Sequence, residues 1–438
     1  MDFRAYSISW NITKRCNLNC AHCYLDADFR GGFRTDELST EECFRVMDQI
    51  AEVNPNPFLI LTGGEPLLRP DIYDLVRYAA DRKFMVVLGT NGTLINKANA
   101  DKLKAAGAHG VGISIDSMDA EKHNRFRGVS RAWENSTKAF EILNEAGLDF
   151  LVQMSVADWN YKEIPDVVAF AEKMGAVAFN LYFLVCTGRG QGNTDISNAA
   201  YEEALKTLYR LQMEYKGRLM INSKCAPQYK RVVYENDPDS VYTRTYSGGC
   251  PAATHYSRIS PEGNLTPCPF IQESVGNLKA ASFKDLWFNA PLMRELRDRK
   301  NLQGKCGTCE FSAMCSGCRA RAFAERGSYM AEDPSCDYQP GKYGGKEITL
   351  KIEDTLGLEV EHNLPWTPEA LSRLERIPSF ARGMVVKGVE KFAEERGHAF
   401  VDEALMKLSR EEMISKRGAM FPFLKKFINS EAGSGGSQ

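Results

Sequence analysis

The segment SISWNITKRCNLNCAHCY, residues 7–24, joins a β-rich run to three closely spaced cysteines. Cys16, Cys20 and Cys23 follow the spacing C-x3-C-x2-C. Thiolates ligate zinc ions and iron–sulfur clusters. A structural zinc site closes four ligands around its ion, whereas three thiolates on one loop can hold three irons of a [4Fe–4S] cluster and leave the fourth iron open. The spacing therefore favours a cluster with one open iron, and a partial zinc site is the alternative.

The composition is ordinary for a folded chain outside membranes. The 438 residues are 43% hydrophobic and 26% charged, with a formal net charge of −2. The length predicts about two or three domains, and the charge gives no reason to expect nucleic acid or an anionic membrane as a partner. We find no apolar run long enough to span a membrane and no signal-peptide pattern, so we predict a cytoplasmic protein. Disulfides are rare in that compartment, and the 13 cysteines then indicate metal binding or catalysis.

Short β-rich runs alternate with helical runs up to about residue 222. We expect six strands, at residues 7–13, 58–66, 84–92, 109–116, 149–156 and 178–184. We expect helices between them, at residues 39–53, 71–82, 97–107, 131–147 and 162–175, the first opened by a capping box of Ser39 and Glu42. Such units predict a parallel sheet covered by helices. Because six strands are too few for an eight-stranded barrel, the expected fold class is α/β, a partial (β/α)6 barrel.

Polar segments follow the expected strands where each one ends. They comprise residues 16–23, 63–66, 90–92 and 114–116. In parallel α/β sheets the functional residues gather at the C-terminal ends of the strands. The four segments are therefore expected to meet at one mouth of the barrel.

A second cysteine-rich region differs from the first part of the chain in its residue composition. Seven cysteines lie between residues 250 and 336, with Cys225 upstream, in a stretch rich in Gly and Pro. A segment with so little regular structure needs cross-links to be stable, and in a reducing compartment bound metal is the expected cross-link. The chain then becomes helical and charged. The expected parts are residues 1–222, 223–345, 346–430 and a flexible tail at 431–438.

The first motif is C-x3-C-x2-C followed by an aromatic residue, and it comes directly after the first expected strand. This motif resembles that of the radical SAM superfamily. The resemblance implies that the open iron chelates the amino and carboxylate groups of S-adenosylmethionine. One electron from the cluster then cleaves the sulfonium, and the 5′-deoxyadenosyl radical takes a hydrogen from the substrate.

The resemblance also implies a set of S-adenosylmethionine contacts. The GGEP segment would meet the amino group, the SID segment the ribose, and the RFRG segment the carboxylate. The implied residues are Gly63, Gly64, Glu65, Pro66, Asn91, Ser114, Asp116, Arg127 and Gln153. Taken singly, GGEP is also compatible with an ordinary turn and Asp116 with a helix cap. We expect His22 and His123 to be surface or packing residues, and Cys43 to be a small buried one.

The later cysteines resemble the SPASM extension of radical SAM enzymes, which carries auxiliary [4Fe–4S] clusters. By their order, Cys306, Cys309, Cys315 and Cys336 would hold one cluster. The other would be held by Cys250, Cys268 and Cys318, with Cys225 as the fourth ligand. The last gap of the CGTCEFSAMCSGC quartet holds two residues where the commoner form has three, and zinc knuckles are the alternative. An electron acceptor, a structural element and a substrate ligand are all compatible roles.

Two stretches resemble tetrapyrrole enzymes. Residues 315–336, CSGCRARAFAERGSYMAEDPSC, resemble the radical SAM enzymes of the alternative haem b and haem d1 pathways. Residues 364–397 resemble a module of the light-independent protochlorophyllide reductase B subunit. The implied function is oxidative decarboxylation or removal of propionate or acetate side chains of an iron porphyrin or siroheme derivative. A ferredoxin- or flavodoxin-type partner would donate electrons. Arg125, Arg127, Arg189 and Lys224 are candidate cations for the substrate carboxylates.

Other functions remain open at this point. A SPASM-type maturase of a ribosomal peptide or of an enzyme cofactor is the main alternative to the tetrapyrrole enzyme. A non-enzymatic electron carrier is a third reading, against which the open-iron motif and the segments expected to contact S-adenosylmethionine both argue.

Overall fold

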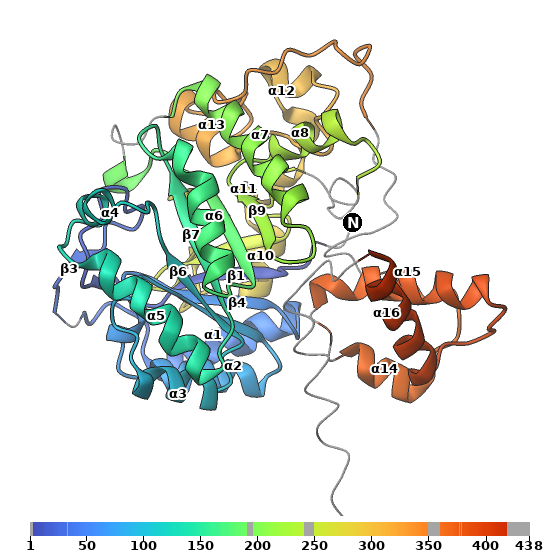
Figure 1. Cartoon of the computed structure of the whole chain (residues 1–438), viewed down its shortest axis with the longest axis horizontal. Coiled ribbons are helices and arrows are strands. Elements are labelled where there is room, and N and C mark those ends of the chain that lie inside the picture. Colours follow the sequence, from blue (N-terminus) through green and yellow to red (C-terminus); the bar gives the residue numbers. More distant parts are fainter. Residues whose placement is uncertain are drawn as a thin grey trace, which may run out of the picture.

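The structure is a computed structural model that describes residues 3–32, 34–190, 196–240, 249–348, 360–375, 377 and 379–417. A large central sheet is covered by helices, and three further helices stand beside it (Figure 1). Within the described ranges, no helix combines the length and apolar character that a membrane span requires.

The central sheet has ten strands in the order β12-β11-β10-β1-β4-β5-β6-β7-β8-β9. The six expected strands are β1 (Ser7–Asn11), β4 (Phe58–Thr62), β5 (Met85–Thr90), β6 (Gly110–Ser114), β7 (Phe150–Val156) and β8 (Ala178–Phe183). They pair in parallel in chain order. The α/β partial-barrel fold class is confirmed.

Four short strands extend this sheet beyond the six that we predicted. They are β9 (Met220–Lys224), β10 (Tyr256–Ile259), β11 (Asn264–Thr266) and β12 (Gly276–Asn277). β9 pairs in parallel with β8, and β10 pairs in parallel with β1, so the cysteine-rich region supplies one edge of the barrel sheet. β11 and β12 continue this edge as antiparallel strands.

Helices cover the outer face of the sheet. The main ones are α1 (Thr40–Val53), α2 (Ile72–Asp81), α3 (Lys97–Ala105), α5 (Ala132–Ala146), α6 (Ile164–Lys173) and α7 (Asn198–Glu214). The Ser39 and Glu42 capping box of α1 is present. Burial alternates along β7: Val152 and Met154 are fully buried, whereas Gln153 and Ser155 are half-buried on the opposite face. Burying such apolar side chains stabilises the outer layer by roughly 1.5–3 kcal/mol each.

The cysteine-rich region packs onto the same hydrophobic core as the barrel. Its helices are α8 (Tyr229–Asn236), α10 (Phe283–Asn289), α11 (Pro291–Arg297), α12 (Gly304–Thr308) and α13 (Arg319–Arg326). Figure 1 shows α12 and α13 at the end of the molecule where α7 and α8 lie. The second region is therefore joined to the barrel through both the sheet and the core.

The C-terminal helices form a small core of their own. α14 (Pro368–Glu375), α15 (Ser379–Glu395) and α16 (Glu403–Arg417) bury Ala370, Val389 and Leu405. The indole Nε1 of Trp366 donates to Glu390 at 2.9 Å, which gives Trp366 a packing role. The tail expected at residues 431–438 lies outside the described residues.

Candidate active site

The first cysteine loop begins in β2 (Arg15–Cys16) and runs past Cys23. Cys16, Cys20 and Cys23 share one small apolar cluster with Leu18 and Ala27. The backbone N–H of Leu18 donates to Sγ of Cys16, and that of Ala27 donates to Sγ of Cys23, both at 3.4 Å. Such bonds suit thiolate ligands of a cluster. Burial raises the pKa of Cys16 to about 12 and also raises the pKa of Cys20, so these thiolates need a metal to balance their charge.

The GGEP turn lies directly against this loop. The N–H of Gly64 donates to the carbonyl of Thr13, and the N–H of Glu65 donates to the carbonyl of Arg15, both at 2.8 Å. A Cβ on Gly64 would lie 2.2 Å from that Arg15 oxygen. Gly63 has φ +150°, and its Cβ would lie 2.5 Å from the Thr13 oxygen. Both glycines are therefore required by close backbone contact with the cluster loop.

Glu65 is fully buried between the ends of β4 and β5. Its carboxylate accepts bonds from Oγ1 of Thr90 at 2.7 Å, from the N–H of Asn91 at 3.0 Å and from the N–H of Leu67 at 3.1 Å. Burial raises the pKa of Glu65 to about 7 against the pull of these donors. The Glu65 carboxylate thus joins the ends of β4 and β5. The contacts of Glu65 and Pro66 with S-adenosylmethionine stay predictions.

The TNG segment is tied to the same cysteine loop by amide side chains. Nδ2 of Asn91 donates to Oδ1 of Asn17 at 2.8 Å, and Nδ2 of Asn17 donates to Oγ1 of Thr93 at 2.7 Å. Asn17 lies between Cys16 and Cys20 in the sequence. The third strand end therefore contributes to the position of the cysteines.

Asp116 and Arg127 form a buried pair behind the cysteine loop. Nε of Arg127 donates to Oδ2 of Asp116 at 2.6 Å, and Nη1 of Arg127 lies 3.9 Å from Sγ of Cys20. The other Asp116 oxygen accepts from the N–H of Ser155 at 3.0 Å. Desolvation opposes ionisation of Asp116, but the adjacent guanidinium holds its pKa below the usual value. Arg127 and Asp116 therefore form an ion pair with each other. Their contacts with S-adenosylmethionine stay predictions.

His123, from α4 (Ala120–Arg127), is buried at the same place. Its Nδ1 accepts the backbone N–H of Asp116 at 3.2 Å, so this nitrogen carries no proton. Burial lowers the pKa of His123 to about 4. The packing role expected for this histidine agrees with these contacts.

The inner face of the sheet is polar. Gln153 pairs in register with Ser114 on one side and with Asn180 on the other. A Cβ on Gly112 would lie 2.8 Å from Nε2 of Gln153, so the amide crosses over the β6 backbone. Tyr182 lies opposite Lys224 at the end of β9. Gln153 and Ser114, both expected to contact S-adenosylmethionine, therefore lie side by side on this sheet.

The candidate cations divide among different places. Nη1 of Arg189 donates to Oδ1 of Asn19 at 2.9 Å, beside the cysteine loop. Arg125 is exposed on α4, whereas Lys224 is half-buried on β9. The candidate cations therefore do not form one cluster: Arg189 lies beside the cysteine loop, and Lys224 lies opposite Tyr182 on the sheet.

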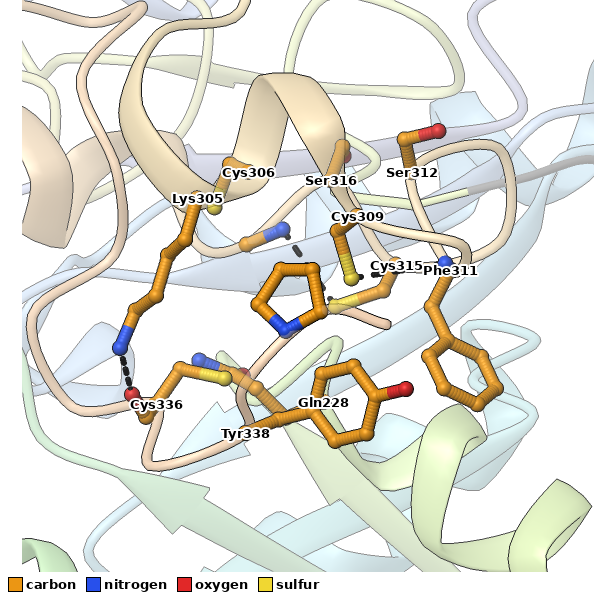
Figure 2. Close-up of a pocket in the computed structure, with 12 residues that line it drawn as sticks. Gln228, Lys305, Cys306, Cys309, Phe311, Ser312, Cys315, Ser316, Cys336 and Tyr338 are labelled. Atoms are coloured by element: carbon orange, nitrogen blue, oxygen red, sulfur yellow. Dashed lines mark hydrogen bonds between the residues drawn. The ribbon is translucent and has the colours of Figure 1, made fainter. Parts of the chain in front are cut away.

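Four cysteines point into one small cavity (Figure 2). Its volume is about 20 Å³. The four cysteines are Cys306, Cys309, Cys315 and Cys336. The N–H of Phe311 donates to Sγ of Cys309, and the N–H of Gly317 donates to Sγ of Cys315, both at 3.4 Å. The donor set is entirely sulfur, which is the ligand type of an iron–sulfur cluster.

The other four cysteines form a second buried neighbourhood. Burial raises the pKa of Cys225, Cys268 and Cys318, and charge repulsion within the group, to which Cys250 contributes in each case, raises it further. Cys225 adopts φ +59°, an uncommon backbone conformation for a residue other than glycine. The eight cysteines therefore lie in two neighbourhoods, and their assignment as ligands of two clusters stays a prediction.

No three or more His, Cys, Asp or Glu side chains among the described residues are close enough to hold a single metal ion. The ligand sets therefore rest on the sulfur-lined cavity, on the N–H bonds to sulfur and on the relatives below.

Sequence reasoning missed Asp333, which connects the two auxiliary groups. Its N–H donates to Sγ of Cys306 at 3.5 Å, and its carboxylate accepts the N–H of Cys318 at 2.6 Å. The same carboxylate pairs with Arg321 at 3.2 Å. Asp333 lies in an irregular segment, and the EDPSC stretch around it offered no motif beyond Cys336.

The comparisons agree with this arrangement. Residues 10–171 match the Radical SAM superfamily, residues 250–310 match the SPASM iron–sulfur cluster-binding domain, and residues 366–410 match the Proto-chlorophyllide reductase 57 kD subunit family. The chain is 39% identical over 347 residues to an AdoMet-dependent heme synthase of Methanosarcina barkeri, covering 76% of this chain and 97% of that relative. It is 31% identical over 358 residues to a pre-heme d1 synthase of Dinoroseobacter shibae, covering 75% and 85%.

Among solved structures, Streptococcus suis SuiB bound to S-adenosylmethionine has a TM-score of 0.62 and 18% identity, covering 77% of this chain and 78% of that one. At this identity the likeness concerns the fold alone. The cofactors are S-adenosylmethionine and several [4Fe–4S] clusters, one in the barrel and auxiliary ones in the SPASM region. The protein belongs to the radical SAM superfamily, in the SPASM-bearing group that includes the AdoMet-dependent heme synthases.

Proposed function

We propose that this protein decarboxylates the propionate side chains of an iron porphyrin oxidatively, as a step of haem biosynthesis. The observation that carries the proposal is the similarity to an AdoMet-dependent heme synthase along 97% of that relative. Similarity to a pre-heme d1 synthase supports the wider class of tetrapyrrole side-chain chemistry.

The arrangement of the chain suits such a reaction. Three thiols lie at the mouth of the barrel, next to the inner face on which Gln153 and Tyr182 lie. The two auxiliary cysteine groups lie in the region that supplies β10 to the same sheet. A substrate on the inner face would therefore have a hydrogen-abstracting group and an electron acceptor within one continuous domain.

The atoms and electrons balance as follows. When bound, the first cluster and S-adenosylmethionine supply a 5′-deoxyadenosyl radical. Removal of one hydrogen atom from the propionate carbon next to the ring leaves a carbon radical. Loss of CO₂ and of one electron then leaves a vinyl group. The hydrogen ends in 5′-deoxyadenosine, and the SPASM region is the part of the chain that can hold an acceptor for the electron.

A ferredoxin- or flavodoxin-type protein is the expected source of the electron that starts each turnover. The alternative is a maturase that acts on a ribosomal peptide or an enzyme cofactor, since SPASM enzymes of that kind share the fold.

A direct experiment separates these functions. The anaerobically reconstituted protein is incubated with S-adenosylmethionine, a reductant and iron-coproporphyrin, siroheme derivatives or a porphyrin without propionates. We expect loss of CO₂ and hydrogen from iron-coproporphyrin in step with 5′-deoxyadenosine release. Slow 5′-deoxyadenosine release with every tetrapyrrole unchanged would refute the tetrapyrrole function and leave the maturase.

A further inference from the structure

A polar pocket lies on the inner face of the sheet where β10 and β11 extend it. Its volume is about 170 Å³, several times the space of one water molecule. Its lining includes Lys14, Leu25, Arg258, Glu262 and Thr266. The first two flank the cysteine loop, and Thr266 lies two residues before Cys268. The pocket is therefore placed between the barrel cysteines and an auxiliary cysteine.

Arg258 is the buried cation of this pocket, with only 5% of its surface exposed. Its Nε donates to Oδ1 of Asn11 at 2.6 Å. Nδ2 of Asn11 in turn donates to the hydroxyl of Tyr24 at 2.9 Å, so the neighbours hold the guanidinium in place. Arg258 pairs in register with Ser9 of β1 and with Thr266 of β11, on the inner face.

Several other buried arginines have carboxylate partners. Arg69 pairs with Asp71, Arg127 with Asp116, Arg231 with Glu202 and Arg321 with Asp333. In the part of the chain that the structure describes, Arg258 has one hydrogen bond, and its partner is a neutral amide. The carboxylate in the pocket, Glu262, is instead paired with Lys14 at 3.6 Å. Leaving a guanidinium buried without a counter-ion is costly, and a ligand anion would remove that cost.

The geometry indicates which anion fits. Because Nε is bound to Asn11, the two Nη groups remain to meet a ligand. A guanidinium binds a carboxylate through two parallel N–H bonds. A polar pocket with room for several water molecules can hold a short carboxylated side chain.

We infer that this pocket is a subsite for one propionate of the tetrapyrrole, with Arg258 as the residue that binds its carboxylate. The inference rests on the proposed function and adds the residue that recognises the substrate. One carboxylated side chain would be seated beside the cysteine loop, and the macrocycle would lie across the open inner face. A different role for Arg258, balancing the charge of a cluster held by Cys268, predicts no selective effect on substrate binding.

The test measures equilibrium binding to the fully reconstituted protein without reductant. Iron-coproporphyrin III is titrated by its visible absorbance, and its propionate methyl ester serves as the uncharged ligand. We expect R258Q to weaken binding of the acid by about tenfold or more and to affect the ester much less. R258K keeps the charge without the planar fork, and its affinity should fall in between.

E262Q supplies a test of opposite sign in the same pocket. This variant removes the carboxylate that lines the pocket and releases Lys14. Binding of the acid should become tighter, whereas a purely structural pocket gives no tightening. Because binding by E262Q is measured on a separate variant, the inference can be tested even if R258Q fails to fold.

The outcomes separate cleanly. Tight binding by the wild type with unchanged binding by R258Q overturns the subsite alone. Equal weakening of acid and ester by R258Q, or weaker binding by E262Q, also overturns it. No binding of any porphyrin by the wild type overturns the proposed function together with the subsite.

Discussion

Arg127 donates from Nε to the carboxylate of Asp116 at 2.6 Å, and both side chains are buried directly behind Cys20. The pair joins the end of β6 to the end of α4, which follow one another around the barrel mouth. A cation beside a cluster ligand offsets negative charge on the sulfur. This pair thus links the fold of the barrel to the position of the first cysteine loop.

Removing the charge of Asp116 should therefore destabilise the folded protein. We expect D116N to lower the free energy of unfolding by about 3 kcal/mol, because it leaves Arg127 buried without its counter-ion. The matched control is D101N, which breaks an exposed pair of Asp101 with Lys97 at 2.8 Å and should cost at most about 0.5 kcal/mol. Urea titration of both variants measures the difference, and equal costs would contradict the account.

The GGEP turn gives a steric prediction. G64A places a Cβ 2.2 Å from the carbonyl oxygen of Arg15, so the cysteine loop must shift. We expect G64A to bind less iron after reconstitution and to form little 5′-deoxyadenosine. G32A is the control, since nothing lies within 4 Å of a Cβ there. Normal iron content in G64A would show that the contact does not position the loop.

His123 gives a prediction about pH. Burial lowers its pKa from 6.5 to about 4, so the unfolded chain takes up a proton more readily than the folded one. Its contribution to stability is present above pH 6.5 and is lost as the pH falls toward 4. H123N retains an acceptor for the N–H of Asp116 but does not titrate. Between about pH 7.5 and 5.5 the wild type should lose about 1.3 kcal/mol more than H123N; parallel curves would contradict this.

Cys225 gives a prediction about cluster ligation. It lies among Cys250, Cys268 and Cys318 and would complete their set. We expect C225A to lower the iron content or to alter the electron paramagnetic resonance spectrum of one auxiliary cluster. The control is C43A, at a buried helical cysteine that contacts Arg69. If C225A has the spectrum and iron content of C43A, Cys225 is not a ligand.

The sequence predicted those features that depend on local pattern. The six parallel strands follow from alternating β-rich and helical runs. The two auxiliary cysteine sets, which the SPASM resemblance implies, stay predictions. The short strands β9 and β10 were missed because they carry polar residues such as Lys224 and Arg258 on the inner face. Such residues weaken the hydrophobic signal of a strand.

Partnerships between distant residues were harder to predict. The contact of Glu65 with S-adenosylmethionine stays a prediction, but the bonds that its carboxylate accepts from Thr90 and Asn91 across the strand ends were not predicted. Asp333 connects two cysteine groups from an irregular segment, and Arg258 is held by Asn11 from the far end of the chain. No periodicity encodes such contacts, because they form only when the sheet brings the segments together.

The most direct measurement follows hydrogen from substrate to cofactor. Iron-coproporphyrin III labelled with deuterium at the propionate carbons next to the ring is incubated with the reduced, reconstituted protein and S-adenosylmethionine. The account predicts one deuterium in each 5′-deoxyadenosine, together with a product lighter by CO₂ and one deuterium. Unlabelled 5′-deoxyadenosine with intact iron-coproporphyrin would contradict it.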